Sequence, residues 1–81
     1  MLKDWEHGDQ VLVIESKVVT PLTVLNCGDI FTLHRTVSGT LILLETHFGV
    51  VATHSAIAKY LINLSKLSSK QKRTVLALYG K

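Results

Sequence analysis

The order of apolar and polar positions predicts short β-strands along the first two thirds of the chain. Residues 10–15 contain four consecutive apolar side chains, which is typical of a strand covered on both faces. Residues 30–37 place Phe31, Leu33 and Val37 on one face, because successive side chains of a strand point to opposite faces. Both segments therefore predict strands.

Glycine-containing turns divide the chain after residue 37. Ser38-Gly39 predicts a tight hairpin turn into a strand at residues 40–45. A second turn at residues 47–49 leads into a short strand at residues 50–53. Short strands separated by such turns favour a small antiparallel barrel or sandwich.

Two stretches fit this pattern less clearly. Residues 17–26 contain the only proline of the chain, Pro21, and predict an irregular or edge connection in which residues 23–25 pair at most briefly. Residues 55–62 fit a helix or a strand, and periodicity leaves both open.

The last part of the chain changes to a helical period. Ser68 followed by Gln71 is a capping-box pattern and predicts a helix over residues 69–79. Gly80 is expected to end it. The apolar stripe of this helix consists of Val75, Leu76 and Tyr79. The fold class is therefore mainly β, with a small β-barrel domain at residues 1–62 and a basic amphipathic helix at 63–81 packed on it.

Size and composition restrict the oligomeric state, the cysteine chemistry and the cellular location that we expect. The chain has 81 residues, of which 47% are hydrophobic, and a domain this small does not easily bury so much apolar surface in one core. We therefore predict a homo-oligomer. The single cysteine, Cys27, excludes an internal disulfide and a multi-cysteine zinc site. Without a secretory signal or an apolar run of about 20 residues, we expect a cytoplasmic protein that does not bind membranes.

Charge is distributed unevenly along the chain. Residues 1–45 hold all six acidic residues and three basic ones, whereas residues 46–81 hold six Lys or Arg and no Asp or Glu. A basic end of this kind favours an anionic partner. The cations expected to contact it are Lys66, Lys70, Lys72 and Arg73.

Two of the candidate residues have an alternative, structural interpretation. Lys72 lies in line with the apolar stripe, where its stem can cover apolar surface while its ammonium reaches water. Trp5 is either a lid over one end of the barrel or an exposed anchor for a partner, because Trp is enriched at binding hot spots.

No set of residues predicts catalysis, a cofactor or a metal. His47 and His54 flank the turn at Gly49, where a hairpin would bring them close to each other. No carboxylate has a familiar metal-ligand spacing, so surface or hydrogen-bonded histidines are favoured. Cys27 is interpreted as a small buried residue rather than a nucleophile. The scattered glycines do not form a phosphate-binding loop. We therefore predict that the protein is not an enzyme.

The stretch Gly8-Asp9-Gln10 with residues 11–14 resembles the opening strand of small SH3-like barrels, including nucleic-acid-binding domains of the KOW type. The later layout, from residue 25 through Gly28-Asp29 to Gly49, is similar to that of small SH3-like proteins of bacteriophages. The resemblance covers residues 8–60 and implies an antiparallel SH3-like barrel that acts as a binding module.

These observations lead to two functional hypotheses. The first is a non-enzymatic module that binds nucleic acid through the basic C-terminal helix, with phosphate contacts that tolerate sequence and weaken with salt. The alternative is a phage-type protein-interaction module that binds and modulates a host protein through apolar strand residues, Trp5 and the helix.

Overall fold

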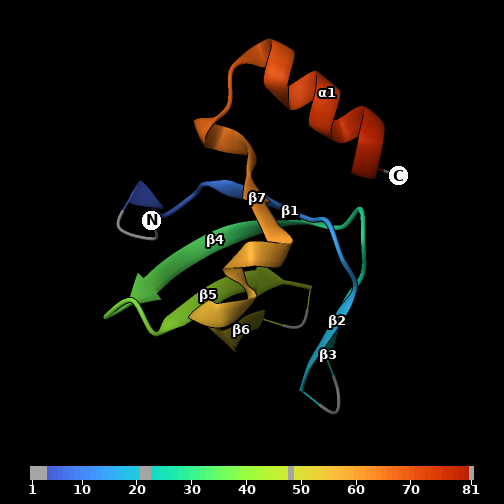
Figure 1. Ribbon diagram of the computed structural model, residues 1–81. Coiled ribbons are helices and arrows are strands. Elements are labelled where there is room, and N and C mark those ends of the chain that lie inside the picture. Colours follow the sequence, from blue (N-terminus) through green and yellow to red (C-terminus); the bar gives the residue numbers. More distant parts are fainter. Residues whose placement is uncertain (1–3, 21–22, 48, 81) are drawn as a thin grey trace.

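The computed structural model describes residues 4–20, 23–47 and 49–80. Within these residues the chain is mainly β, with antiparallel strands followed by a C-terminal helix (Figure 1), which confirms the predicted fold class at this level. The strands are β1 (Gln10–Val13), β2 (Lys17–Thr20), β3 (Thr23–Leu25), β4 (Ile30–Val37), β5 (Leu41–Thr46), β6 (Gly49–His54) and β7 (Leu61–Asn63). The helices are the 3₁₀-helices η2 (Ser55–Tyr60) and η3 (Leu64–Lys66) and the α-helix α1 (Ser69–Tyr79).

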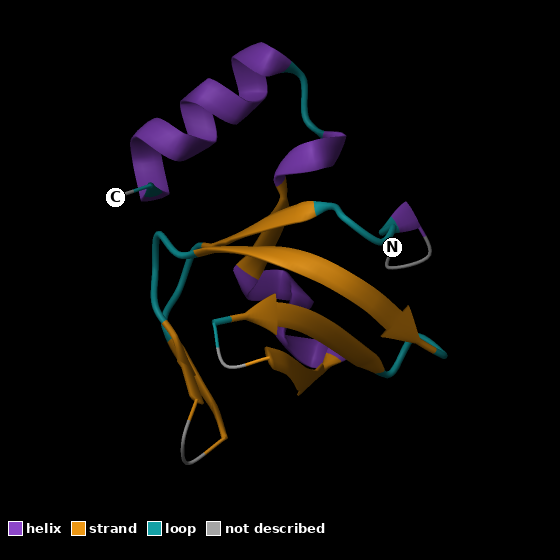
Figure 2. Ribbon diagram, turned by 180° about the vertical axis from the view of Figure 1, so that it is seen from behind, coloured by secondary structure: helices purple, strands orange, loops and turns teal. Residues whose placement is uncertain are grey.

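In the described part of the chain, five strands form one antiparallel sheet in the order β6-β5-β4-β1-β7, and β2 pairs with β3 as a separate hairpin. In the views of Figures 1 and 2, α1 lies at one end of the molecule and the β2–β3 hairpin projects at the other. Strands β6 and β7 are the edges of the five-stranded sheet, and no strand pairing between described residues joins them. A closed SH3-like barrel therefore stays a prediction.

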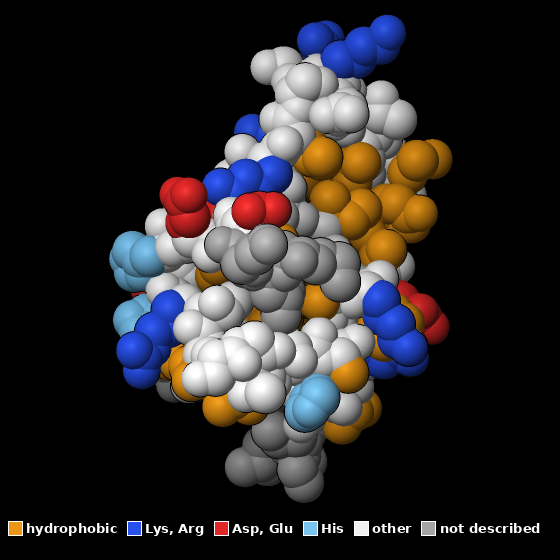
Figure 3. All heavy atoms as spheres, turned by 60° about the vertical axis from the view of Figure 1, so that its left-hand side comes forward, with side chains coloured by type: hydrophobic (Ala, Val, Ile, Leu, Met, Phe, Trp, Pro, Cys, Tyr) orange, Lys and Arg blue, Asp and Glu red, His pale blue; other side chains and the backbone are white. Residues whose placement is uncertain are grey.

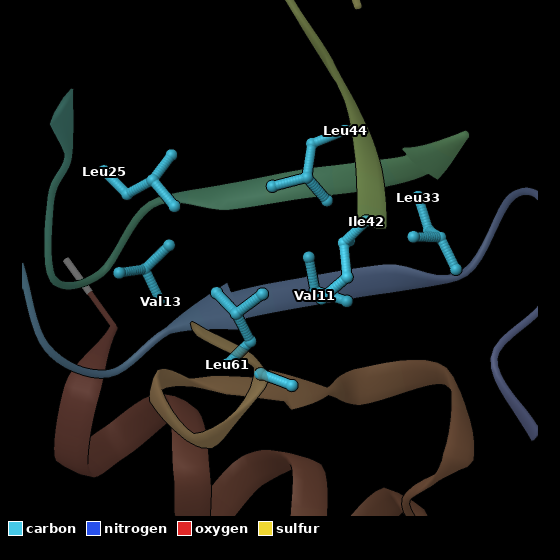
Figure 4. Close-up of a cluster of buried hydrophobic side chains, with 8 residues drawn as sticks. Val11, Val13, Leu25, Leu33, Ile42, Leu44 and Leu61 are labelled. Carbon is cyan, nitrogen blue, oxygen red and sulfur yellow. The ribbon is translucent and has the colours of Figure 1, made fainter. Parts of the chain in front are cut away.

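One face of this sheet carries the main core. Figure 4 shows side chains from β1, β4, β5 and β7, with Leu25 from β3, pointing toward one another. Ile57 and Ala58 bring η2 against the same cluster. The buried members of this cluster are Val11, Val13, Leu25, Leu33, Ile42, Leu44, Ala58 and Leu61.

The prediction that β1 is covered on both faces is confirmed. Val11 and Val13 belong to the main core, whereas Leu12 between them is fully buried outside that cluster, on the opposite face. The helix η3 also lies against β1, and the backbone N–H of Gln10 donates to the hydroxyl of Ser65 over 3.0 Å. The segment that leads into α1 is thereby attached to β1.

The two stretches with ambiguous patterns are more regular than expected. The irregular or edge connection predicted at residues 17–26, with brief pairing at 23–25, is a separate two-stranded hairpin: β3 pairs with β2, Val18 lies opposite Val24, and the register shifts between Val18 and Thr20. Pro21, which led to that prediction, lies outside the described residues. At residues 55–62 both alternatives are present in succession, since the helix η2 is followed directly by β7.

The predicted hairpin turn at Ser38-Gly39 joins β4 to β5. Both residues have positive φ, 49° for Ser38 and 69° for Gly39, and the N–H of Thr40 donates to the Val37 carbonyl over 2.9 Å. Positive φ at both central positions is the type I′ arrangement, which matches the twist of the strands. Serine is strained there because its Cβ crowds the following carbonyl.

We expect Ser38→Asn to raise the free energy of unfolding by about 0.5–1 kcal/mol, because asparagine tolerates the left-handed region better than serine. Urea denaturation of the two proteins measures this difference. As a control, Thr74→Asn changes an exposed helix residue and should not stabilise the protein. A Ser38→Asn variant no more stable than the parent would contradict the argument.

The ends of α1 also follow the prediction. The Ser68 hydroxyl accepts from the Gln71 N–H over 3.2 Å, and the Gln71 side chain accepts from the Ser68 N–H over 3.0 Å, which completes the capping box. At the other end a Cβ on Gly80 would lie 2.5 Å from the carbonyl oxygen of Leu76. A side chain at position 80 would therefore clash with the Leu76 carbonyl, and this end of the helix requires glycine.

Candidate nucleic-acid interface

The first five residues of α1 carry three of the four predicted cations. Lys70, Lys72 and Arg73 are all exposed, and none forms an ion pair with any residue that the structure describes. Lys70 and Arg73 are three residues apart and share one side of the helix. Lys72 lies on the opposite flank, so that the cations fan out around the start of α1.

This placement of positive charge opposes the stability of the helix. The backbone N–H groups at a helix N-terminus create a partial positive charge, which favours acidic side chains there and disfavours basic ones. Yet α1 has no acidic residue in its first turn and no basic residue in its last. Figure 3 shows the Lys and Arg side chains projecting from the end of the molecule formed by α1. The positive potential of the side chains and that of the helix end thus coincide.

The half-buried residues of α1 are Val75 and Leu76 of the predicted stripe, while Tyr79 is exposed. Lys72 is exposed like Lys70, although it was expected in line with this stripe. All three cations of α1 are therefore accessible to a ligand.

Lys66 is separated from these cations by its contacts. It lies in η3 with its ammonium 3.6 Å from a Glu6 carboxylate oxygen and 3.7 Å from Oδ2 of Asp9. These acidic groups offset its charge. The structure thus places the Lys66 ammonium in contact with the N-terminal turn, unlike the three cations on α1.

The carboxylate of Asp9 is the centre of that contact. It is buried, and its Oδ2 accepts from the backbone N–H of Glu6 and from the Asn63 side chain, both over 2.9 Å. Burial acts to raise the pKa of Asp9, but the hydrogen bonds from Asn63 and Glu6 and the positive charge of Lys66 outweigh it, and the net effect lowers this pKa. Asp9 is therefore a charged structural residue.

The placement of Trp5 fits the structural interpretation of this residue better than that of an exposed anchor. Its side chain is half-buried and packs against the main core cluster. A second aromatic residue, Tyr60, is contacted by a cation, since the Lys17 ammonium lies 4.1 Å from the centre of its ring. Lys17 also lies 3.6 Å from a carboxylate oxygen of Glu15, so this cation is less free than those of α1.

Apolar surface lies next to the basic end of the molecule. Figure 3 shows hydrophobic side chains gathered below the cations of α1. Exposed large apolar residues include Leu78, with 70% of its surface accessible, and Tyr79 and Ile30. The end of α1 lies close to the loop before β4, because the Cys27 thiol is 4.0 Å from the Tyr79 carbonyl oxygen.

The prediction that Cys27 is buried was wrong. Its residue is exposed in the turn between β3 and β4, and its backbone N–H donates to the Ser16 hydroxyl over 2.9 Å. Glycine and asparagine around it form the turn, and the thiol lies 3.5 Å from the Ile14 carbonyl oxygen and 4.0 Å from that of Tyr79. Among the described residues it forms no arrangement with a histidine that would indicate a nucleophile.

His47 and His54 fit the interpretation that the sequence favours, since one is a surface histidine and the other is hydrogen-bonded. His54 caps η2, with its Nδ1 accepting from the N–H of Ala56 over 3.0 Å, and His47 is exposed in the turn after β5. The structure also brings together His7, His34 and Glu45 from three separate segments. No short spacing in the sequence marks this group, which only the pairing of the strands assembles.

Comparisons with known proteins give no relative for this chain: no family model, no curated protein and no solved structure matches it. Among the described residues, no helix is both long enough and apolar enough to cross a membrane.

Proposed function

We propose that this protein is a non-enzymatic binding module that contacts nucleic-acid phosphates through Lys70, Lys72 and Arg73 at the start of α1. The observation that carries the proposal is the position of these three exposed cations at the positive end of a helix without an acidic residue. Positive charges at that position destabilise the helix. The negative phosphates of a polyanion would offset this repulsion and be attracted by both the side chains and the helix end.

The chemistry of these groups supports contact with the backbone rather than reading of bases. Lys and Arg side chains and the N–H groups of a helix start all donate hydrogen bonds to phosphate oxygens. The described aromatic residues do not surround the cations: Tyr60 is contacted by Lys17, Trp5 packs on the core, and Tyr79 is the last residue of α1, at the end opposite the cations. We therefore expect weak binding that tolerates any nucleic-acid sequence. The expected setting of this binding is the cytoplasm.

The test is fluorescence anisotropy with a labelled DNA duplex, comparing the parent with Lys70→Gln/Lys72→Gln/Arg73→Gln. If all three cations contact phosphate, affinity for the parent falls roughly 40-fold between 50 and 200 mM salt, because each contact contributes about −0.9 to the slope of log K against log salt. The triple variant should lose binding at low salt and with it this salt dependence.

The matched control is Lys17→Gln/Arg35→Gln/Lys59→Gln, which removes three cations from β2, β4 and η2. Both triple variants bring the formal net charge from +3 to zero. If the control loses as much affinity as the α1 variant, net charge and not α1 governs binding. Absence of binding by the parent at low salt would reject the proposal.

The second candidate is a protein-interaction module of the phage type, favoured by the exposed apolar side chains beside α1. Contact of this surface with a second copy of the chain would produce the predicted homo-oligomer. Pull-down of one dominant, nuclease-resistant partner would favour this candidate over nucleic acid. Sedimentation before and after nuclease treatment separates self-association from co-purified nucleic acid.

The SH3-like barrel is part of the same proposal. The short helix η2 directly connects the edge strands β6 and β7, which supports a sheet curved enough to bring its edges together. A barrel of this kind would serve as a rigid support for the α1 surface.

A further inference from the structure

Three side chains with metal-binding atoms lie together on the surface, away from α1. His7 comes from the turn before β1, His34 from β4 and Glu45 from β5. One ligand atom from each, an imidazole nitrogen or a carboxylate oxygen, lies within 4.8 Å of the other two. The two imidazole rings meet edge to face with their centres 5.5 Å apart.

The backbone holds these three positions in place. The N–H of Gly8 donates to the Leu33 carbonyl over 2.9 Å, and the N–H of Leu33 donates to the Asp9 carbonyl over 2.7 Å, which fixes the turn of His7 beside β4. The pairing of β4 with β5 shifts between Leu33 and Arg35. Such a bulge redirects side chains, and here it directs His34 toward Glu45, with His34 Nδ1 3.8 Å from a carboxylate oxygen.

A hydrogen bond determines which nitrogen of His7 is free. Nδ1 of His7 lies 2.7 Å from the backbone carbonyl oxygen of His34. Because a carbonyl oxygen only accepts, Nδ1 carries the proton and Nε2 carries the lone pair. A backbone carbonyl that holds Nδ1–H is a common outer partner of a metal-binding histidine, since it fixes the ring and its tautomer.

We propose that His7, His34 and Glu45 bind one zinc ion. Two imidazoles and one carboxylate are donors that zinc accepts, and ligand atoms around a tetrahedral zinc are about 3.4 Å apart. The donor atoms already lie within 4.8 Å of one another, and rotation of the exposed His7 and Glu45 side chains and the half-buried His34 would bring them to that separation. Three protein ligands leave the fourth position open to water or to a ligand from a partner.

The first experiment titrates zinc into the full chain, without a histidine tag, in competition with a chromophoric chelator. We expect one zinc ion per chain. In a parallel NMR titration, the ring signals of His7 and His34 should shift or broaden, while those of His47 and His54 should not. Absence of binding even at millimolar zinc, or a response centred on His47 or His54, would overturn the proposal.

Variants identify the ligands without relying on the wild-type spectra. His7→Ala, His34→Ala and Glu45→Gln should each lower zinc affinity at least 10-fold, since even loss of an outer partner of a metal ligand costs that much. His47→Ala is the matched control, because it removes an exposed imidazole from the turn after β5, and should leave affinity unchanged. If it weakens binding as much as His34→Ala does, the site is elsewhere. Nucleic-acid binding by these variants is expected to be unchanged, so this result is independent of the function proposed for α1.

Discussion

Replacing Asp9 by alanine should lower the free energy of unfolding by about 2–4 kcal/mol. The Asp9 carboxylate accepts hydrogen bonds from Glu6 and Asn63 and lies 3.7 Å from the Lys66 ammonium. Its loss leaves the buried Asn63 amide without that acceptor and Lys66 without its less exposed partner. Urea denaturation at neutral pH measures the change.

The matched control is Glu6→Ala. Glu6 is the other carboxylate near Lys66, but its side chain is largely exposed, and an exposed ion pair contributes about 0–1 kcal/mol. If Asp9→Ala costs no more than Glu6→Ala, the buried contacts of Asp9 contribute no more to stability than an exposed ion pair.

The effect of Asp9 should also depend on pH. Because the pKa of Asp9 is lower in the folded protein than its ordinary value of 3.8, folding favours the ionised form. The resulting stability is present above the pKa of the unfolded chain and is lost as the pH falls through the folded pKa. The stability difference between the parent and Asp9→Ala should therefore be constant near neutral pH and become smaller below about pH 4.

The contact between Asp9 and Lys66 could not be predicted from the sequence. From the sequence, Asp9 was a turn residue and Lys66 one of four cations in a basic tail. Their contact depends on the pairing of β1 with β7 and on the position of η3 beside β1. Residues so far apart in the sequence meet only through this tertiary pairing. The spacing of apolar and polar residues along the chain does not predict such a contact.

Local signals were more informative. The capping box of Ser68 and Gln71 and the turn at Ser38-Gly39 depend on neighbouring residues, and both are present as predicted. The exposed cations of α1 followed from the same local pattern. The group of His7, His34 and Glu45 did not, because a bulge between β4 and β5 and a bend of the N-terminal segment assemble it.

The second large effect is expected for Leu12→Ala, which should lower the free energy of unfolding by about 2–5 kcal/mol. Leu12 is fully buried although it lies outside the main core cluster. Removing its side chain leaves a cavity beside β1, the strand that η3 contacts. Urea denaturation measures the loss of stability, and hydrogen exchange shows whether η3 and α1 lose protection with it.

Ile30→Ala is the matched control, because Ile30 pairs directly with Leu12 across β1 and β4 and shares its face. Ile30 is 46% exposed, so less apolar surface returns to water and its truncation should cost only about 1 kcal/mol. Equal losses from the two variants would show that the face of the sheet shared by Leu12 and Ile30 is not a second core. A larger loss from Leu12→Ala, with weaker protection of α1, would show that this face fixes the basic helix to the sheet, and that the cations of α1 act from a rigid support.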